Sequence, residues 1–356
     1  AFFLVASMLS AVMGRWAEGV GGRRALRLAA LWAAAAELLV AVGARSLVLL
    51  TVLLGFAGAA NALAQPAANL VIARALPAQR QGIGFAVKQS AIPFSTFLGG
   101  IAVPALALTF GWRWAFVAAA VLAVLSAAVI PGGSAGADTR SPRARREVVV
   151  GDPVVAFPAE GGAGDGRLPM PVMVVLATGA ALGAAAAGTL GAFLVSAGVA
   201  SGMSEGAAGL ALTLGSALGI ASRLWAGALA DRRSGGHLRW VAVMLALGSF
   251  GYLLFATGRP GLLVAGLPLA FGAGWAWPGL FNLAVVLANP ASPGAATGVT
   301  QTGTYLGAVL GPLLFGLVAE HLSFGWSWSL AALTSWLAAA AIWTGRGMLR
   351  RSRRDR

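Results

Sequence analysis

The sequence contains no cysteine and only two histidines among its 356 residues. Without cysteine the chain has no disulfide framework and no thiolate metal site, and two isolated histidines make no histidine-based metal cluster. We therefore expect neither a metal nor a cofactor. No nucleophile, base and orienting residue recur at a useful spacing, so an enzyme is the least favoured class. Charged residues are also scarce, at 10% against roughly 25% in a soluble domain.

Apolar residues make up 58% of the chain and give a mean hydropathy of +0.82. About 20 apolar residues in a helix cross a bilayer core. Apolar runs of that kind, about eleven in number, predict an all-α, polytopic membrane protein. They span residues 1–18, 25–42, 47–73, 82–109, 114–131, 169–197, 204–226, 238–257, 261–287, 298–319 and 328–345.

The net charge of +14 comes from arginines that lie between the apolar runs. A nucleic-acid-binding face needs clustered basic residues and few apolar runs, so this distribution favours membrane topology over nucleic acid. Alternate connections are arginine-rich, and basic loops stay in the cytoplasm. We therefore expect a multi-pass protein of the bacterial plasma membrane, with a cytoplasmic C-terminus and basic loops on anionic lipids. The arginine-rich connections are 15–27, 74–80, 140–167, 232–239 and 346–356.

The chain carries an internal repeat. An offset of 213 residues separates Glu18 from Asp231 and Gly14 from Gly227. One offset across most of the chain indicates two homologous halves, which in membrane proteins is typical of transporters. We expect the first of twelve original helices to be absent, because 170–200 has no partner before Ala1. The predicted parts are an N-terminal bundle at 1–131, a cytoplasmic linker at 132–168, a C-terminal six-helix bundle at 169–345 and a basic tail at 346–356.

The repeated loop carries a family resemblance. The stretch from Gly227 through Asp231 and Arg232 to Gly235 resembles the loop signature of the major facilitator superfamily (MFS), which joins the second and third helices of each half. The first copy has Glu where Asp is usual and no arginine directly after it. The resemblance implies two six-helix bundles that rock about a central cavity, with these loops as gates. The first copy consists of Gly14, Glu18, Gly22, Arg23 and Arg24.

The two loops have a physical rationale as gates. The glycines let neighbouring helices approach closely. Glu18 and Asp231 stand at helix ends, where a carboxylate can meet the N-terminus of a neighbouring helix or the loop arginines. Arg223, one turn before Gly227, is expected to support the gate. A loop that only obeys the positive-inside rule would explain the arginines but not the paired acids and glycines.

Amide side chains mark a candidate substrate cavity. Asn61, Gln65 and Asn69 are four residues apart and share one helix face. In the family's layout this helix lines the cavity. The alternative is that the amides join helices by hydrogen bonds, worth about 0.6 kcal/mol each. The second copy of this helix contributes Trp275, Trp277 and Asn282 to the candidate cavity, with Asn282 at the position of Asn69.

Lys88 is the single lysine of the chain and precedes Gln89. Six residues after Gly82, it lies about 9 Å into the membrane, at a depth similar to that of Gln65. A lysine near a helix centre costs about 2.5–3.5 kcal/mol, so we expect a cavity charge that favours an anionic solute or is gated by a coupling proton. A snorkelling lysine is the alternative. Gln301 and Tyr305 are expected to face it from the second half.

Glu37 is a carboxylate deep in a span of the first half and a candidate proton carrier. In the family's layout its helix is peripheral, so a packing role is the favoured alternative.

The predicted function is secondary active transport of a small polar or anionic solute, as a monomer, with protons as candidate coupling ions. Residues 61–69 and 88–93 loosely resemble bacterial branches grouped with cyanate and nitroimidazole transporters. A proton-driven exporter, favoured if Trp275, Trp277 and Phe281 dominated the cavity, and a non-transporting receptor or scaffold stay as alternatives.

Overall fold

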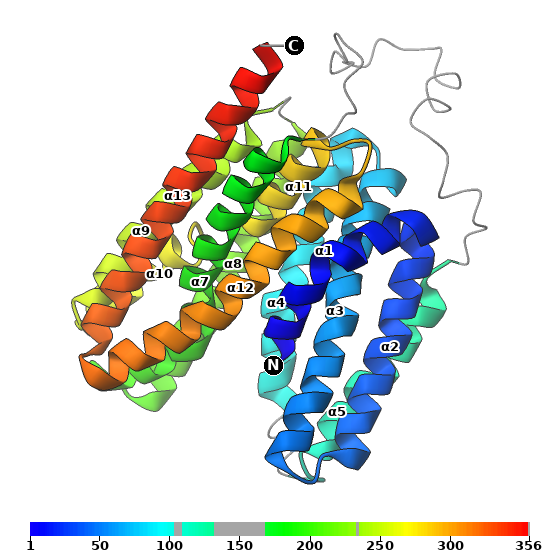
Figure 1. Ribbon diagram of the computed structural model, residues 1–356. Helices are drawn as coiled ribbons and strands as arrows, with labels where there is room; N and C mark the ends of the chain where they lie inside the picture. The colour runs from blue at the N-terminus through cyan, green and yellow to red at the C-terminus, as the bar shows by residue number, and fades with distance from the viewer. Residues whose placement is uncertain (103–108, 132–167, 233–234, 355–356) are drawn as a thin grey trace.

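The computed structural model describes residues 1–102, 109–131, 168–232 and 235–354. These residues are helical and form two groups, α1 to α5 and α7 to α13 (Figure 1). The first group consists of α1 (Phe2–Val20), α2 (Gly22–Gly43), α3 (Leu47–Ala75), the short η1 (Ala78–Arg80), α4 (Gln81–Ala102) and α5 (Arg113–Val129). The second consists of α7 (Met170–Ala200), α8 (Glu205–Asp231), α9 (His237–Ala256), α10 (Pro260–Ala270), α11 (Pro278–Ala288), α12 (Pro293–His321) and α13 (Phe324–Arg354).

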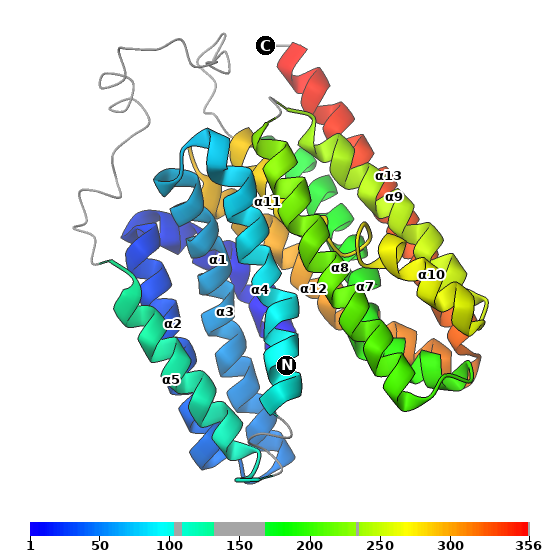
Figure 2. The same ribbon diagram turned by 180° about the vertical axis from the view of Figure 1, so that it is seen from behind.

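The fold is that of an all-α, polytopic membrane protein with two pseudo-symmetric bundles. Six of the described helices, α2, α3, α7, α8, α9 and α12, are long and apolar enough to cross a membrane. The remaining long helices run alongside them (Figures 1 and 2). Many leucine, valine and tryptophan side chains on the outside are exposed, as expected of a surface that faces lipid.

The predicted span 261–287 is wrong in one respect, because two helices occupy it. α10 ends at Ala270 and α11 begins at Pro278, with turns between them. Pro268 and Pro278 flank these turns, and proline cannot donate the hydrogen bond that would continue a helix. An interruption inside a span is tolerated where neighbouring helices satisfy the backbone.

Two further boundaries differ from the expectation. The predicted span 82–109 corresponds to α4, which ends at Ala102, and residues 103–108 lie outside the described part. The predicted basic tail is helical as far as Arg354, where it forms the last turns of α13. Almost all of the predicted linker, 132–167, also lies outside the described residues.

The turns α1–α2, α3–α4, α8–α9 and α11–α12 lie at one end of the molecule, together with the end of α13 (Figure 1). We call this the basic end, because Arg23, Arg24, Arg74, Arg80 and Arg232 stand there. The two groups meet at the basic end and diverge towards the opposite end in both views (Figures 1 and 2). Contacts between the groups are made mainly by α1 with α12 and by α4 with α8.

Candidate functional site

Asp231, the last residue of α8, binds the start of α4 in the other group. Its Oδ1 accepts a hydrogen bond from the Gly82 amide at 2.6 Å, and its Oδ2 accepts one from the Ile83 amide at 2.9 Å. The first amides of a helix have no partner within the helix and carry the positive end of its dipole. One carboxylate therefore joins the two groups at the basic end.

Glu18 makes the corresponding contact on the other side of the molecule. Its Oε1 accepts a hydrogen bond from the amide of Gly294, near the start of α12, at 2.5 Å. Its Oε2 pairs with Arg74 Nη2, also at 2.5 Å. Arg74 was not among the predicted gate residues; it stands in the last turn of α3 and reaches the acid from the same group. Of the predicted loop arginines, Arg24 and Arg232 are exposed and Arg23 is half-buried.

The signature glycines permit these contacts. A Cβ on Gly14 would lie 2.5 Å from the Gly294 carbonyl oxygen, and one on Gly227 would lie 2.5 Å from the Ala86 Cβ. Gly22 packs within its own group, where a Cβ would lie 3.0 Å from Val71. Gly235 serves a different purpose, because its φ of 151° is rarely adopted by other residues and helps turn the chain into α9.

Lys88 lies in a cluster with two of the predicted amides. Its Nζ donates hydrogen bonds to Gln65 Oε1 and, at 3.0 Å, to Asn69 Oδ1. Asn69 is fully buried, and its Nδ2 has no partner among the described residues. The Lys88 ammonium thus points towards α3 and lies level with Gln65 and Asn69. Neighbouring Gln89 is buried.

The third amide of the stripe, Asn61, reaches the other group. Its Nδ2 donates to the Tyr305 hydroxyl on α12 at 2.9 Å, and the Tyr305 ring stacks on Phe3 with centroids 6.0 Å apart. Ser7 of α1 donates to the Thr302 carbonyl at 2.8 Å. Gln301 lies buried one turn before Tyr305. Polar side chains therefore follow the interface between the groups from the basic end towards the middle.

The two tryptophans of the second half differ in burial. Trp277 is 1% exposed and packs against Gly183 of α7, in a core cluster that also contains Phe85 of α4 from the other group. The Trp277 ring lies against Gly183, where a Cβ would come within 3.0 Å of it, so close packing with α7 accounts for the position of the ring. Trp275 is half-buried and stacks against Arg223. Asn282 is buried, and both its side-chain atoms lack a partner in the described part of the chain.

Two charged residues lie apart from the gate contacts. Arg223 was expected to support the gate, but its Nη2 donates to the Trp275 carbonyl oxygen at 2.6 Å, between α10 and α11. The interrupted helix supplies a free carbonyl there, which explains the difference. Glu37 is half-buried on α2, and α2 packs mainly on α3 and α5 of its own group. Glu37 is therefore not part of the cluster around Lys88.

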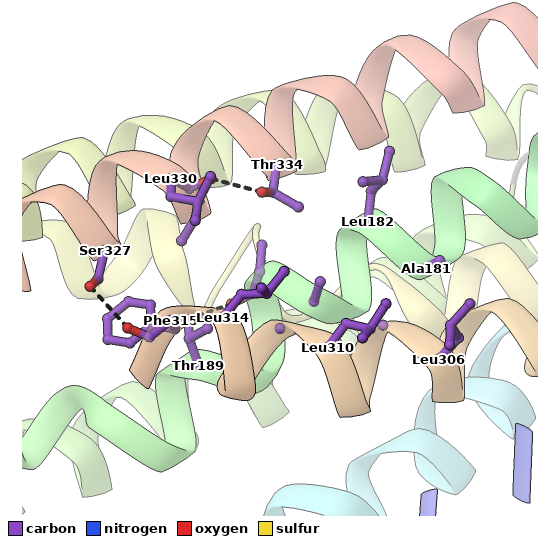
Figure 3. A pocket seen from close by; sticks show the side chains of 15 residues that line it. Ala181, Leu182, Thr189, Leu306, Leu310, Leu314, Phe315, Ser327, Leu330 and Thr334 are labelled. Carbon is purple, nitrogen blue, oxygen red and sulfur yellow. Dashed lines mark hydrogen bonds between the residues drawn. The ribbon is translucent and has the colours of Figure 1, made fainter. Parts of the chain in front are cut away.

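A cavity of about 190 Å³ lies elsewhere, between α7, α12 and α13 (Figure 3). None of the predicted cavity residues lines it, and its walls are mostly Ala and Leu. Its three hydroxyls already donate to backbone carbonyls: Thr189 to Ala186, Ser327 to Phe315 and Thr334 to Leu330. The cavity thus offers no free hydroxyl donor to a polar solute, and Leu306, Leu310 and Leu314 beside it are exposed on the outer surface.

Three solved structures share this architecture. The human organic anion transporter MFSD10 (TETRAN) superposes with a TM-score of 0.72 at 20% identity, over 96% of this chain and 82% of that chain. The proton:xylose symporter XylE gives 0.70 at 17% identity, over 96% and 84%. FucP, in the outward conformation, gives 0.64 at 15% identity, over 97% and 88%. At these identities the likeness shows the fold.

A sequence relative covers a smaller part of the chain. The chloroplastic sodium-dependent phosphate transport protein 1 of Arabidopsis thaliana is 32% identical over 104 residues, which are 29% of this chain and 20% of that protein. The family model described as Major Facilitator Superfamily matches residues 1–232 and 176–355. Together these matches span nearly the whole chain, and the fold agrees with them. The chain therefore belongs to the Major Facilitator Superfamily of membrane transporters.

Proposed function

We propose that the protein is a secondary active transporter that moves a small polar or anionic solute by alternating access between two bundles, 1–131 and 169–345. The pair of gate contacts at the basic end carries this proposal. Asp231 binds Gly82 and Ile83, and Glu18 binds Gly294, so each half contributes one acid that holds a helix of the other half.

These contacts are suited to a reversible gate. A hydrogen bond to a charged group contributes about 1.5–3 kcal/mol, and its strength depends on geometry that a small rotation of the bundles would remove. The glycines beside the acids allow helix backbones to touch without interlocking side chains. Two such contacts can hold one state closed and still be released when the bundles rock.

The gate contacts also bear on which conformational state, inward-facing or outward-facing, the protein adopts. The arginine-rich connections favour a cytoplasmic basic end, and the gate closes that end. Under this topology the protein faces outward, its C-terminus is cytoplasmic, and it sits in a bacterial plasma membrane.

Lys88 supports an anionic solute. Its hydrogen-bond partners, Gln65 and Asn69, are neutral, so its charge is not cancelled by them. Two similar proteins are named as a phosphate transport protein and an organic anion transporter, which agrees with an anionic solute. A multidrug exporter would be favoured if Trp275, Trp277 and Phe281 dominated the cavity. Trp277 and Phe281 are buried in the core, which does not favour that alternative. The likeness to cyanate transporters stays a prediction, as does the monomeric state.

Proteoliposomes that contain the protein provide the test. Uptake of labelled phosphate, succinate, lactate and xylose is measured with and without a pH gradient, for the wild-type protein and for Lys88→Ala. We expect anion uptake in the wild type and a loss of at least about tenfold in Lys88→Ala, the effect of one charged hydrogen bond. Arg45→Ala, at an exposed position outside the spans, serves as the control.

Normal anion uptake by Lys88→Ala would remove the anion preference from the proposal. Uptake of xylose but of no anion would have the same consequence, and would leave transport itself standing. A pH gradient that accelerates uptake would identify protons as the coupling ion.

A further inference from the structure

Arg223 is a buried cation whose hydrogen-bonding capacity is mostly unused. Its side chain is 2% exposed. Nη2 donates to the Trp275 carbonyl oxygen at 2.6 Å, and the guanidinium lies 5.0 Å from the centre of the Trp275 ring. Nε and Nη1 are buried without a partner in the described part of the chain. Buried polar groups are almost always hydrogen-bonded, so these two nitrogens require an explanation.

No carboxylate compensates this charge within the described residues. The acids there are five in number. Glu18 and Asp231 are held in the gate, Glu37 lies on α2, and Glu205 and Glu320 stand at the opposite end of the molecule. A buried charge without a partner is strongly unfavourable. The guanidinium is always charged and presents a planar fork of donors that matches an oxyanion.

Arg223 and Lys88 come from different bundles and stand on two helices that pack against each other, α8 and α4. Ala86 of α4 contacts both Gly227 of α8 and Gly279 at the start of α11. Lys88 lies two residues beyond Ala86, and Arg223 lies one helical turn before Gly227. Because α4 and α8 run in opposite directions, both cations lie on the membrane side of the Gly82–Asp231 gate contact, at a depth of about 9–12 Å.

Free amide donors lie at the same interface. Asn69 Oδ1 accepts from Lys88 Nζ, while Asn69 Nδ2 has no partner in the described part of the chain. Asn282, which corresponds to Asn69 in the repeat, leaves both Nδ2 and Oδ1 unpartnered in the described part of the chain. Among these described groups the unpartnered donors, Arg223 Nε and Nη1 and the two Nδ2, outnumber the single unpartnered acceptor, Asn282 Oδ1. Such an arrangement is complementary to a ligand that only accepts hydrogen bonds.

We propose that Lys88 and Arg223 form a two-cation site that bridges the bundles and binds a small divalent oxyanion, such as a dicarboxylate or sulfate-like ion. This inference rests on the proposed transport function and specifies the substrate class. A dianion would neutralise both fixed charges, whereas a monoanion would leave one buried cation uncompensated. Binding to groups from both halves would also couple the solute to the closed state of the gate.

The purified wild-type protein gives the first test. A ligand that binds only the folded state stabilises it by RT ln(1 + L/Kd), where L is the free ligand concentration, so at equal concentrations the tighter ligand raises the melting temperature more. We expect sulfate and succinate, at neutral pH, to bind at least about tenfold more tightly than nitrate and lactate, because each dianion gains a second charged contact. Equal affinities for dianions and monoanions would overturn the two-cation site without any variant being made.

Variants then separate the two cations. Arg223→Gln should reduce the preference for succinate over lactate by about tenfold or more, whereas Arg223→Lys should retain most of it. Lys88→Gln should act in the same direction as Arg223→Gln. Arg259→Gln, at an exposed arginine before α10, is the control. A folded Arg223→Gln protein with an unchanged preference would show that Arg223 is structural and overturn the inference.

The experiments distinguish a failure of the two-cation site from a failure of the proposed transport function. If anions are taken up by proteoliposomes in a Lys88-dependent way, but dianions and monoanions are equivalent, transport stands and the two-cation site falls. If no anion binds and none is taken up, both fall. If Arg223→Gln does not fold, the comparison of succinate with lactate on the wild-type protein decides.

Discussion

At the residue scale, each of the two gate acids uses both oxygens of its carboxylate to hold a neighbouring group. Asp231 uses both oxygens, each on a different backbone amide of α4. Glu18 divides its oxygens between a backbone amide of α12 and Arg74. The sequence pattern indicated that these acids would meet a helix start or an arginine. Which helix and which arginine depended on residues far away in the chain.

Asp231→Asn should weaken the gate without preventing insertion. An asparagine has one acceptor oxygen in place of two, so one of the two amides of α4 loses its partner and the charge is lost as well. We expect a decrease in transport of about tenfold, with normal amounts of protein in the membrane. Uptake per inserted molecule is the measurement. Glu320→Gln, the same type of change at an exposed site, is the control, and equal behaviour of the two variants would remove Asp231 from the gate.

At the element scale, small residues decide how closely the helices pack. α12 lies on α7 along Gly303, Gly307 and Gly311, where a Cβ would come within 2.1, 1.9 and 2.2 Å of backbone oxygens of α7. Such a stripe of glycines on one helix face is typical of close helix packing. The broken helix α10–α11 was not expected, because proline in a membrane span is compatible with a continuous, kinked helix as well as with an interruption.

Gly307→Ala should therefore destabilise the second bundle. The added methyl group would force α12 away from α7, and overpacking of this kind costs about 1–3 kcal/mol. We expect a lower melting temperature in detergent. Gly191→Ala on α7 is a matched control, because a Cβ there meets nothing within 4 Å. Equal melting temperatures for the two variants would contradict the close approach of α7 and α12.

At the scale of the whole molecule, the two bundles are joined at the basic end and in the middle of the interface. The joining hydrogen bonds in the described residues run from Glu18–Gly294 and Asp231–Gly82 to Asn61–Tyr305. The site of Lys88 and Arg223 lies between these levels, beyond the gate. Towards the opposite end the two groups of helices lie further apart (Figures 1 and 2).

The sequence contains no cysteine, so one introduced thiol can report whether the basic end is closed. Thr297 is 0% exposed at the basic end of α12, so Thr297→Cys should react slowly with a membrane-impermeant thiol reagent added at that side. Combined with Glu18→Gln and Asp231→Asn, it should react at least about tenfold faster, because two gate contacts are lost. Ala75→Cys, which is exposed, controls for access of the reagent. Equal rates in both backgrounds would contradict the gate.

The sequence by itself determined the class of fold, because apolar runs of bilayer length, alternating arginine-rich connections and a repeat at one offset are local or periodic features. It also placed Lys88 at the depth of Gln65 and Asn69, since helix rise converts residue number into depth. Only the tertiary structure decided that Trp277 is buried in a core, that Arg74 holds Glu18, and that Arg223 turns to the break between α10 and α11. These contacts depend on which helix faces meet, and packing between segments that are distant in the sequence determines which faces meet.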